Sequence, residues 1–190
     1  EVNVAYGHAL ASFYGRASYD YKGKYLFEAN LRADGSSRFG KNNKFGYFPS
    51  ASAAWRLSDE SWFKPLKFIN DAKLRFSIGQ TGNEAIDNYT AQGTFITGRN
   101  YLTYAGVAPY QMPNADLTWE TTTQYNLGLD LSFFYGRLDF VFDAYIKNTK
   151  DLLYEVPMPN TTGFTSVINN VGEIQNKGLE FSINSKNFVK

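Results

Sequence analysis

The chain has 190 residues, 43% of them hydrophobic, which is enough for one domain with a sizeable core. Its net charge of +1 and the lack of any run of Lys or Arg argue against a nucleic-acid-binding protein, which needs phosphate contacts. Cysteine is absent, and this excludes disulfide bonds and thiolate metal sites.

Apolar runs in the chain fall short of the roughly 20 residues that a transmembrane helix needs, but a membrane-spanning strand needs apolar residues only at alternate positions. Tyr and Phe supply most of the 17% aromatic content, which is typical of proteins at a membrane–water interface. The chain begins at Glu1 without an initiator Met or a signal-peptide pattern, so we expect a processed chain or an internal piece.

Apolar residues recur at every second position in about seven segments, which predicts antiparallel strands. In chain order the predicted strands cover residues 9–21, 25–34, 49–58, 73–81, 121–133, 138–147 and 179–184. In each segment one face is free of charge while the opposite face carries at least one charged residue. A Lys or Arg facing lipid at mid-bilayer costs about 2–4 kcal/mol, so a lipid environment would enforce this segregation.

The connections between the predicted strands alternate in length. Those at 22–24, 59–71 and 134–137 are short or compact. Those at 35–47, 82–116 and 150–172 are longer and rich in Gly, Asn and Thr. Short turns at one rim and long loops at the other are typical of outer-membrane barrels.

Two further features concern the rims. Aromatic residues such as Tyr25 and Trp55 gather near the short turns, whereas Tyr47, Phe48 and Trp119 are expected to form a second girdle at the other rim. In the compact connection, Ser58 or Asp59 is expected to cap a short helical turn with Trp62, Phe63, Leu66 and Phe68 on its apolar side.

A soluble antiparallel sandwich also alternates apolar and polar residues, so any single strand fits either class. The charge-free face, the unequal connections and the two girdles together favour the barrel. Bacterial single-chain barrels have an even number of strands from about eight upward, so about seven strands predict a fragment. The predicted fold class is therefore all-β, an antiparallel transmembrane β-barrel segment that is incomplete as given.

Four ordered motifs make a family resemblance specific. Arg32–Gly40 (RADGSSRFG), followed by Gly46–Ser50 (GYFPS), resembles the signature of SusC/RagA-type TonB-dependent outer-membrane transporters of Bacteroidetes. Three later stretches resemble the same family in the same order: Leu74–Asn83, Asn114–Asp130 and Val171–Ser182. The resemblance covers nearly the whole chain.

The resemblance implies a barrel of about 22 strands around an N-terminal plug, in the outer membrane of a Gram-negative bacterium. Residues 1–190 would be part of that single barrel domain, with the plug and the TonB box outside this chain. No terminal strand ends in an aromatic residue, because Phe188 is followed by Val189 and Lys190. The family also implies a SusD-like surface lipoprotein as a lid, energy from TonB, and oligosaccharide, glycan or peptide substrates.

The loop at 82–115 is the candidate ligand surface, because aromatic rings stack on sugar faces and pack on peptide side chains. Its candidate contact residues are Tyr89, Phe95, Tyr101, Tyr104 and Tyr110. Packing of these rings within the loop, or against a lid partner, is an equally good interpretation.

Charged residues of the polar face are expected to face the barrel lumen or the plug. They are Arg32, Asp34, Arg38, Glu120, Asp130 and Asp143. Paired carboxylates could suggest a glycosidase, but basic residues are interleaved with them on the same face, so mutual neutralisation is the better interpretation. His8 is the only histidine, which leaves no catalytic triad and no His-based metal site. We expect no enzyme, cofactor or metal.

The sequence thus predicts part of an active outer-membrane importer of oligomeric nutrients. A passive porin, a structural SusC-like subunit of a larger outer-membrane complex, and a soluble carbohydrate-binding sandwich remain alternatives.

Overall fold

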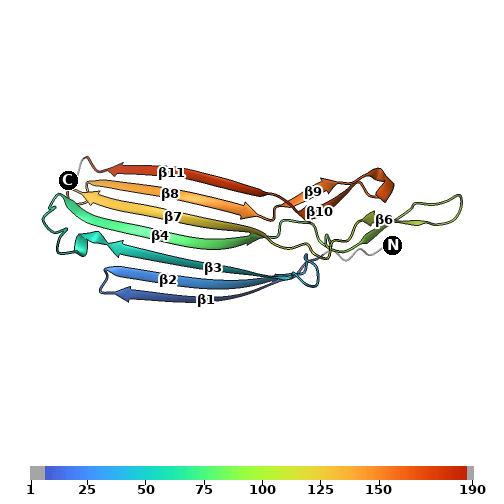
Figure 1. Cartoon of the computed structure of the whole chain (residues 1–190), viewed down its shortest axis with the longest axis horizontal. Coiled ribbons are helices and arrows are strands. Elements are labelled where there is room, and N and C mark those ends of the chain that lie inside the picture. The colour runs from blue at the N-terminus through green and yellow to red at the C-terminus, as the bar shows by residue number, and fades with distance from the viewer. Residues whose placement is uncertain (1–6, 188–190) are drawn as a thin grey trace.

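A computed structural model describes residues 7–187, and one antiparallel sheet of seven long strands dominates it (Figure 1). The strands lie in the order β1-β2-β3-β4-β7-β8-β11. Their bounds are Leu10–Tyr21 (β1), Tyr25–Ser36 (β2), Phe45–Arg56 (β3), Ile69–Asn83 (β4), Glu120–Phe133 (β7), Leu138–Lys150 (β8) and Glu173–Ser185 (β11). All seven predicted strands are therefore confirmed, in the predicted chain order.

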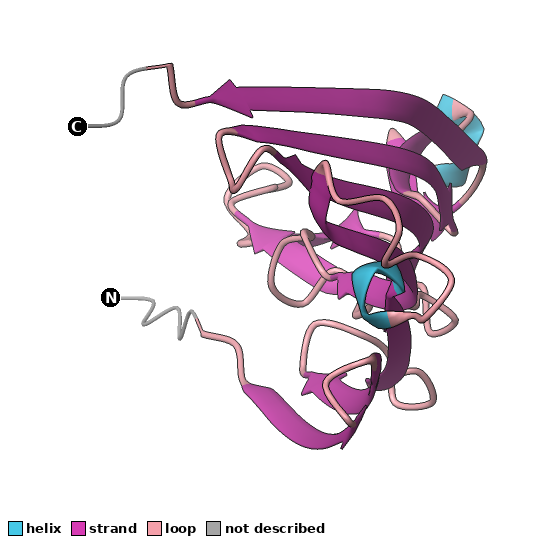
Figure 2. Ribbon diagram, turned by 90° about the vertical axis from the view of Figure 1, so that its left-hand side faces the viewer, coloured by secondary structure: helices cyan, strands magenta, loops and turns pink. Residues whose placement is uncertain are grey.

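The cross-strand register aligns the apolar positions of all seven strands on one face. One row runs across the sheet through Tyr19, Phe27, Ala53, Phe76, Leu127, Ala144 and Leu179. Because successive side chains of a strand point to opposite faces, a slip of one residue would mix the two sets. The sheet is curved along its width, as a section of a barrel wall would be (Figure 2).

The short and long connections lie at opposite ends of the sheet, as predicted. The turns between β1 and β2, β3 and β4, and β7 and β8 gather at the left in Figure 1. Two small hairpins project from the other end: β5 (Thr94–Thr97) with β6 (Val107–Gln111), and β9 (Leu153–Pro157) with β10 (Ser166–Asn170). The 82–115 segment therefore contains a strand pair that its sequence did not reveal. The short 3₁₀ turn η2 (Asn160–Thr162) lies between β9 and β10. Within residues 7–187, no helix has both the length and the apolar character to cross a membrane.

Some predicted boundaries and one predicted cap are wrong. The loop expected at 35–47 is shorter, because the backbone NH of Ser36 donates to the Lys44 carbonyl at 2.9 Å and the strands continue to that point. The helical turn near residue 59 is the 3₁₀ turn η1 (Leu57–Asp59), and no side chain caps it. Ser58 lies inside η1, and its hydroxyl donates instead to Asp71 at 3.0 Å.

The strands extend beyond their predicted bounds, and this places three charged residues at positions of the apolar face: Lys150 of β8, and Glu173 and Lys177 of β11. Strand β11 begins at Glu173, several residues before the predicted start, and this brings Lys177 into register with Ile146 near the loop end of the sheet. A long Lys side chain can lie along an apolar surface while its ammonium group reaches a polar boundary.

The only buried hydrophobic cluster of the described residues lies at the loop end, not in the sheet itself. It consists of Phe39, Phe48, Ile86, Ala91, Leu117 and Trp119, which we call the loop-base cluster. Phe48 and Trp119 therefore do not form the expected outer girdle, whereas Tyr47 is exposed on the apolar side. Register explains the difference, since Phe48 pairs with Arg32 on the polar face.

Candidate functional site

The polar face carries an ion-pair network across three neighbouring strands. The Arg75 guanidinium of β4 donates to Asp130 of β7 at 2.8–3.1 Å and to Asp143 of β8 at 3.1–3.2 Å. Lys73 lies 3.1 Å from the same Asp130 carboxylate, and the Asn126 amide donates to Asp143 at 3.0 Å. Two of the predicted lumen carboxylates, Asp130 and Asp143, are thus each paired with a cation, as expected from the interleaved charges.

Gly128 makes room for this network. It lies in register between Arg75 on one neighbouring strand and Asp143 on the other. A Cβ atom at Gly128 would lie 2.6 Å from Arg75 Nη2 and 2.6 Å from Asp143 Oδ1. The missing side chain therefore lets one guanidinium reach across a whole strand, and a glycine in the middle of a polar row was the available sequence signal.

Arg32 and Asp34 form a second pair, near the loop end of the polar face. Arg32 Nε lies 2.7 Å from Asp34 Oδ2, and Asp34 is only 3% exposed. The Arg32 side chain remains 60% exposed, so its outer edge faces open space. A groove of about 550 Å³ surrounds it; its lining includes Ser12, Tyr14, Asn30, Arg32, Ser50 and Gln80.

Arg38 and Glu120 hold loops in place and do not join the network of Arg75. Arg38 Nε donates to Asn88 at 3.1 Å, and its Nη1 donates to the Glu84 carbonyl at 3.1 Å. Glu120 accepts from the Asn83 amide at 3.2 Å and from a backbone NH of β9 at 3.3 Å. Two of the six predicted charged residues therefore connect the sheet to the segments above it.

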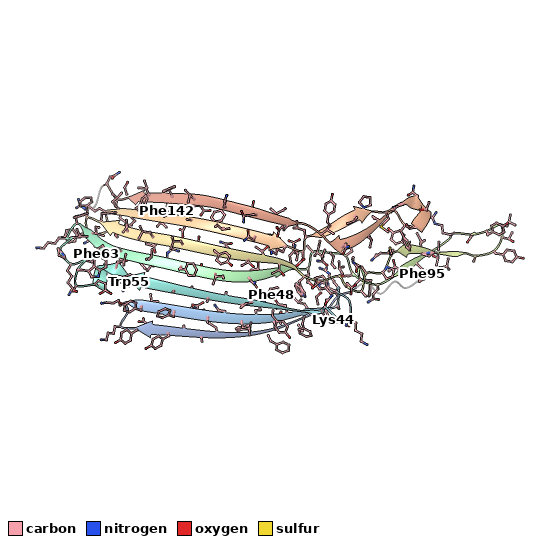
Figure 3. All side chains as sticks on the ribbon, viewed as in Figure 1. Lys44, Phe48, Trp55, Phe63, Phe95 and Phe142 are labelled. Carbon is pink, nitrogen blue, oxygen red and sulfur yellow. The ribbon has the colours of Figure 1, made fainter. Side chains whose placement is uncertain are left out.

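The loop-base cluster brings together distant parts of the chain. The Phe48 and Trp119 rings meet edge to face at 5.5 Å, and Phe39 contacts the same indole at 5.0 Å. Trp119 Nε1 donates to the carbonyl of Lys44 at 3.1 Å. The cluster anchors the loops after β2 and β4 on the polar face, near Phe48 in Figure 3. Sequence reasoning missed it, although a Phe at a polar-register position was a usable signal.

Four of the five predicted contact rings project into solvent from the β5–β6 segment. Phe95, Tyr101, Tyr104 and Tyr110 are each more than two-thirds exposed, whereas Tyr89 lies outside the hairpin and is 37% exposed. Figure 3 shows Phe95 beyond the end of the main sheet. The four rings therefore pack little against the rest of the described chain.

At the opposite end, Glu60 organises the short-turn rim, and sequence reasoning did not identify it. Its Oε1 accepts from the Tyr25 hydroxyl at 2.8 Å and from Trp55 Nε1 at 3.0 Å, and its Oε2 accepts from Lys24 Nζ at 3.2 Å. These three hydrogen bonds hold the pKa of Glu60 below its usual range. The carboxylate thereby fixes the orientation of two aromatic rings.

Nothing in the described part of the chain groups three or more His, Cys, Asp or Glu side chains in a way that could hold a metal ion. The polar face carries hydrogen-bond donors, acceptors and paired charges.

Comparison with known proteins agrees with this architecture. Residues 3–188 match the family model described as "TonB dependent receptor-like, beta-barrel". The chain is 48% identical over 179 residues to TonB-dependent receptor P39 of Formosa agariphila, and it is 37% identical over 190 residues to TonB-dependent receptor SusC of Bacteroides thetaiotaomicron. These alignments cover 94% and 96% of the chain, but only 17% and 19% of the two relatives.

Solved structures show the same likeness. A structure of the RagAB peptide importer in the "closed-closed" state superposes with a TM-score of 0.89 at 32% identity, covering 96% of this chain and 20% of that one. The siderophore receptor PirA of Acinetobacter baumannii shares the fold, with a TM-score of 0.66 at 15% identity. Proteins of this kind are outer-membrane β-barrels of Gram-negative bacteria, so the apolar face of the sheet faces lipid and the polar face lines the lumen. The chain belongs to the TonB-dependent receptor β-barrel family and is SusC/RagA-like within it.

Proposed function

We propose that this chain forms part of the wall of an active outer-membrane importer of oligomeric nutrients. The observation that carries the proposal is the two-sided curved sheet, with a lipid-facing apolar surface and a lumen surface of hydroxyls, amides and paired charges. Similarity to SusC at 37% identity and to the RagAB peptide transporter at 32% identity supports transport as the activity.

We place residues 1–190 within a single barrel domain, with the plug and the TonB box in other parts of the receptor. Strands β1 and β11 support this, since β1 is exposed along its whole length, β11 is exposed at every residue except Gly178, and each pairs on one side only within residues 7–187. Long unpaired strand edges are unfavourable in lipid, where each backbone NH and carbonyl needs a partner. Further strands of the same barrel would supply those partners.

The exposed β5–β6 hairpin supports a surface partner at the loop end. A SusD-like lipoprotein would cover this end as a lid, with Phe95, Tyr101, Tyr104 and Tyr110 contacting either the lid or the substrate. Aromatic rings of this kind serve both sugar faces and peptide side chains, so oligosaccharides and peptides are both candidate substrates. One similar solved protein is described as a peptide transporter.

In the proposed cycle the lid opens, the substrate binds along the lumen face, and TonB-driven displacement of the plug releases it into the periplasm. No covalent chemistry is proposed. Asp130 and Asp143 support this, because both carboxylates bind the same Arg75 guanidinium.

The test uses the complete receptor with its cognate lipoprotein in cells, and measures uptake of fluorescent oligosaccharide and peptide pools. We expect uptake of one pool, its loss in a TonB-deficient strain, and a several-fold decrease with the double variant Tyr101→Ala and Tyr104→Ala. Tyr135→Ala is the matched control, since that ring is 92% exposed at the opposite end. Uptake that persists without TonB would refute active import and identify a passive pore.

A further inference from the structure

The connection between β3 and β4, residues 57–68, is a fixed structure that we call the rim turn. Within this turn, the backbone NH groups of Glu60, Phe63 and Leu66 each donate to the carbonyl three residues earlier, at 3.0–3.1 Å. The carboxylate of Glu60 ties the turn to β2 and β3 through the hydrogen bonds described above. Figure 3 shows Phe63 and Trp55 together at this end of the sheet.

The rim turn lies on the lipid-facing side of the wall. Trp62 packs edge to face on Trp55 at 6.3 Å, and Trp55 belongs to the apolar row that contains Tyr25 and Leu74. At the other end of the turn, Phe68 stacks on Phe133 of β7, with ring centroids 6.4 Å apart. Both contacts extend the apolar face beyond the ends of the strands.

Apolar and basic side chains alternate along the exposed part of this turn. Trp62, Leu66 and Phe68 are 59%, 40% and 52% exposed. Lys64 and Lys67 lie between them and are also exposed. A turn that served only to reverse the chain would have no need for three large exposed apolar side chains.

The nearby acids do not neutralise these two lysines. Glu60 is bound to Lys24 at 3.2 Å, and both Asp59 and Asp71 lie within 4.0 Å of the Arg56 guanidinium. In the described part of the chain, no ion pair within 4.0 Å joins Lys64 or Lys67 to a carboxylate. The rim turn therefore presents two uncompensated positive charges beside an apolar surface.

We propose that the rim turn is a binding site for anionic phospholipid headgroups in the periplasmic leaflet of the outer membrane. The short-turn end of such barrels faces the periplasm. Trp62, Leu66 and Phe68 enter the boundary between acyl chains and headgroups, while the ammonium groups of Lys64 and Lys67 bind lipid phosphates. Charge complementarity and continuity with the lipid-facing sheet identify the occupant as a membrane lipid.

The experiment measures the heat-induced unfolding midpoint of the complete receptor in liposomes of phosphatidylcholine alone or with phosphatidylglycerol. We expect phosphatidylglycerol to raise the midpoint of the wild type, and the Lys64→Gln, Lys67→Gln double variant to lose most of that increment. In phosphatidylcholine alone the two proteins should unfold at the same temperature. Each of the two lysines, Lys64 and Lys67, should raise the apparent affinity of the receptor for an anionic lipid surface about fivefold.

Two controls separate this site from other causes. Lys41→Gln removes an exposed lysine at the loop end and should leave the phosphatidylglycerol increment unchanged. Added inorganic phosphate should not reproduce the increment in phosphatidylcholine liposomes. An unchanged increment in the double variant, an equal loss with Lys41→Gln, or an equal effect of free phosphate would each overturn the proposal.

Discussion

Replacing Phe48 with Ala should release the loops that the loop-base cluster anchors. Phe48 is 7% exposed and packs against Trp119 in the cluster. Its ring also lies directly on two backbone segments: Cβ atoms built on Gly46 and Gly82 would lie 2.5 Å and 2.0 Å from Phe48 Cζ. Removing the ring would therefore leave a cavity between β3, β4 and the loop that carries Trp119.

The expected cost follows from the burial of this ring. Phe→Ala substitutions in well-packed sites cost about 3–5 kcal/mol, and the backbone on both sides of Phe48 is held in a sheet and cannot easily collapse into the gap. The lost packing free energy should favour local opening of the loops, because the register of the seven strands does not depend on this ring. A cost of about 3 kcal/mol corresponds to roughly a hundredfold increase in the population of the open state.

Hydrogen–deuterium exchange of the complete receptor in detergent measures this opening. Amides of residues 84–92 and 113–119 should exchange about a hundredfold faster in Phe48→Ala, while amides within β7 and β8 should not change. Phe95→Ala is the matched control, since that ring is 69% exposed in the hairpin. If Phe48→Ala and Phe95→Ala changed exchange equally, the assignment of Phe48 as a loop anchor would be wrong.

Three further predictions concern other parts of the wall. Because the pKa of Glu60 is lowered, the stability that its carboxylate contributes is complete above the ordinary glutamate pKa and is lost as the pH falls through the lowered value. Glu60→Gln should therefore flatten the acid side of a plot of melting midpoint against pH. Gly40→Ala puts a Cβ atom 2.2 Å from the Ala115 carbonyl oxygen and should destabilise by about 1–3 kcal/mol in denaturant titrations, unlike Gly15→Ala, which meets open space. Phe76→Arg on the lipid face should cost about 2–4 kcal/mol in urea-dependent folding into liposomes, and a loss under about 1 kcal/mol would contradict the assigned face.

The sheet was predictable because its signal is local. Alternation with period two assigns each residue to a face without knowledge of its neighbours in space, and lipid keeps charge off one of those faces. The residues of the β7 segment, from Thr121 to Phe133, show this most clearly, and the structure extends that strand by one residue to Glu120. The boundaries near Ser36 and Phe45 were less predictable, because backbone hydrogen bonds between the strands decide where the loop begins.

The charged residues divided into two groups that the sequence could not separate. Asp130 and Asp143 have the same alternation as Glu120, but only the register of three strands brings both to one Arg75 side chain. Glu120 and Arg38 instead face segments above the sheet. A polar-face position therefore predicts that a residue lies on the lumen side of the sheet. Which residue it contacts depends on how close to the loop end of the strand it lies.

By itself, the sequence determined the strand order along the chain, the lipid-facing and lumen-facing sets, and the opposite ends of short and long connections. Only the tertiary structure decided that Phe48 and Trp119 form a core and not a girdle, and that Glu60 holds Tyr25 and Trp55. The physical reason is sequence separation: Trp119 donates to a carbonyl 75 residues earlier, at Lys44. Local periodicity carries no information about such contacts, because they form only when the sheet brings distant loops to one end.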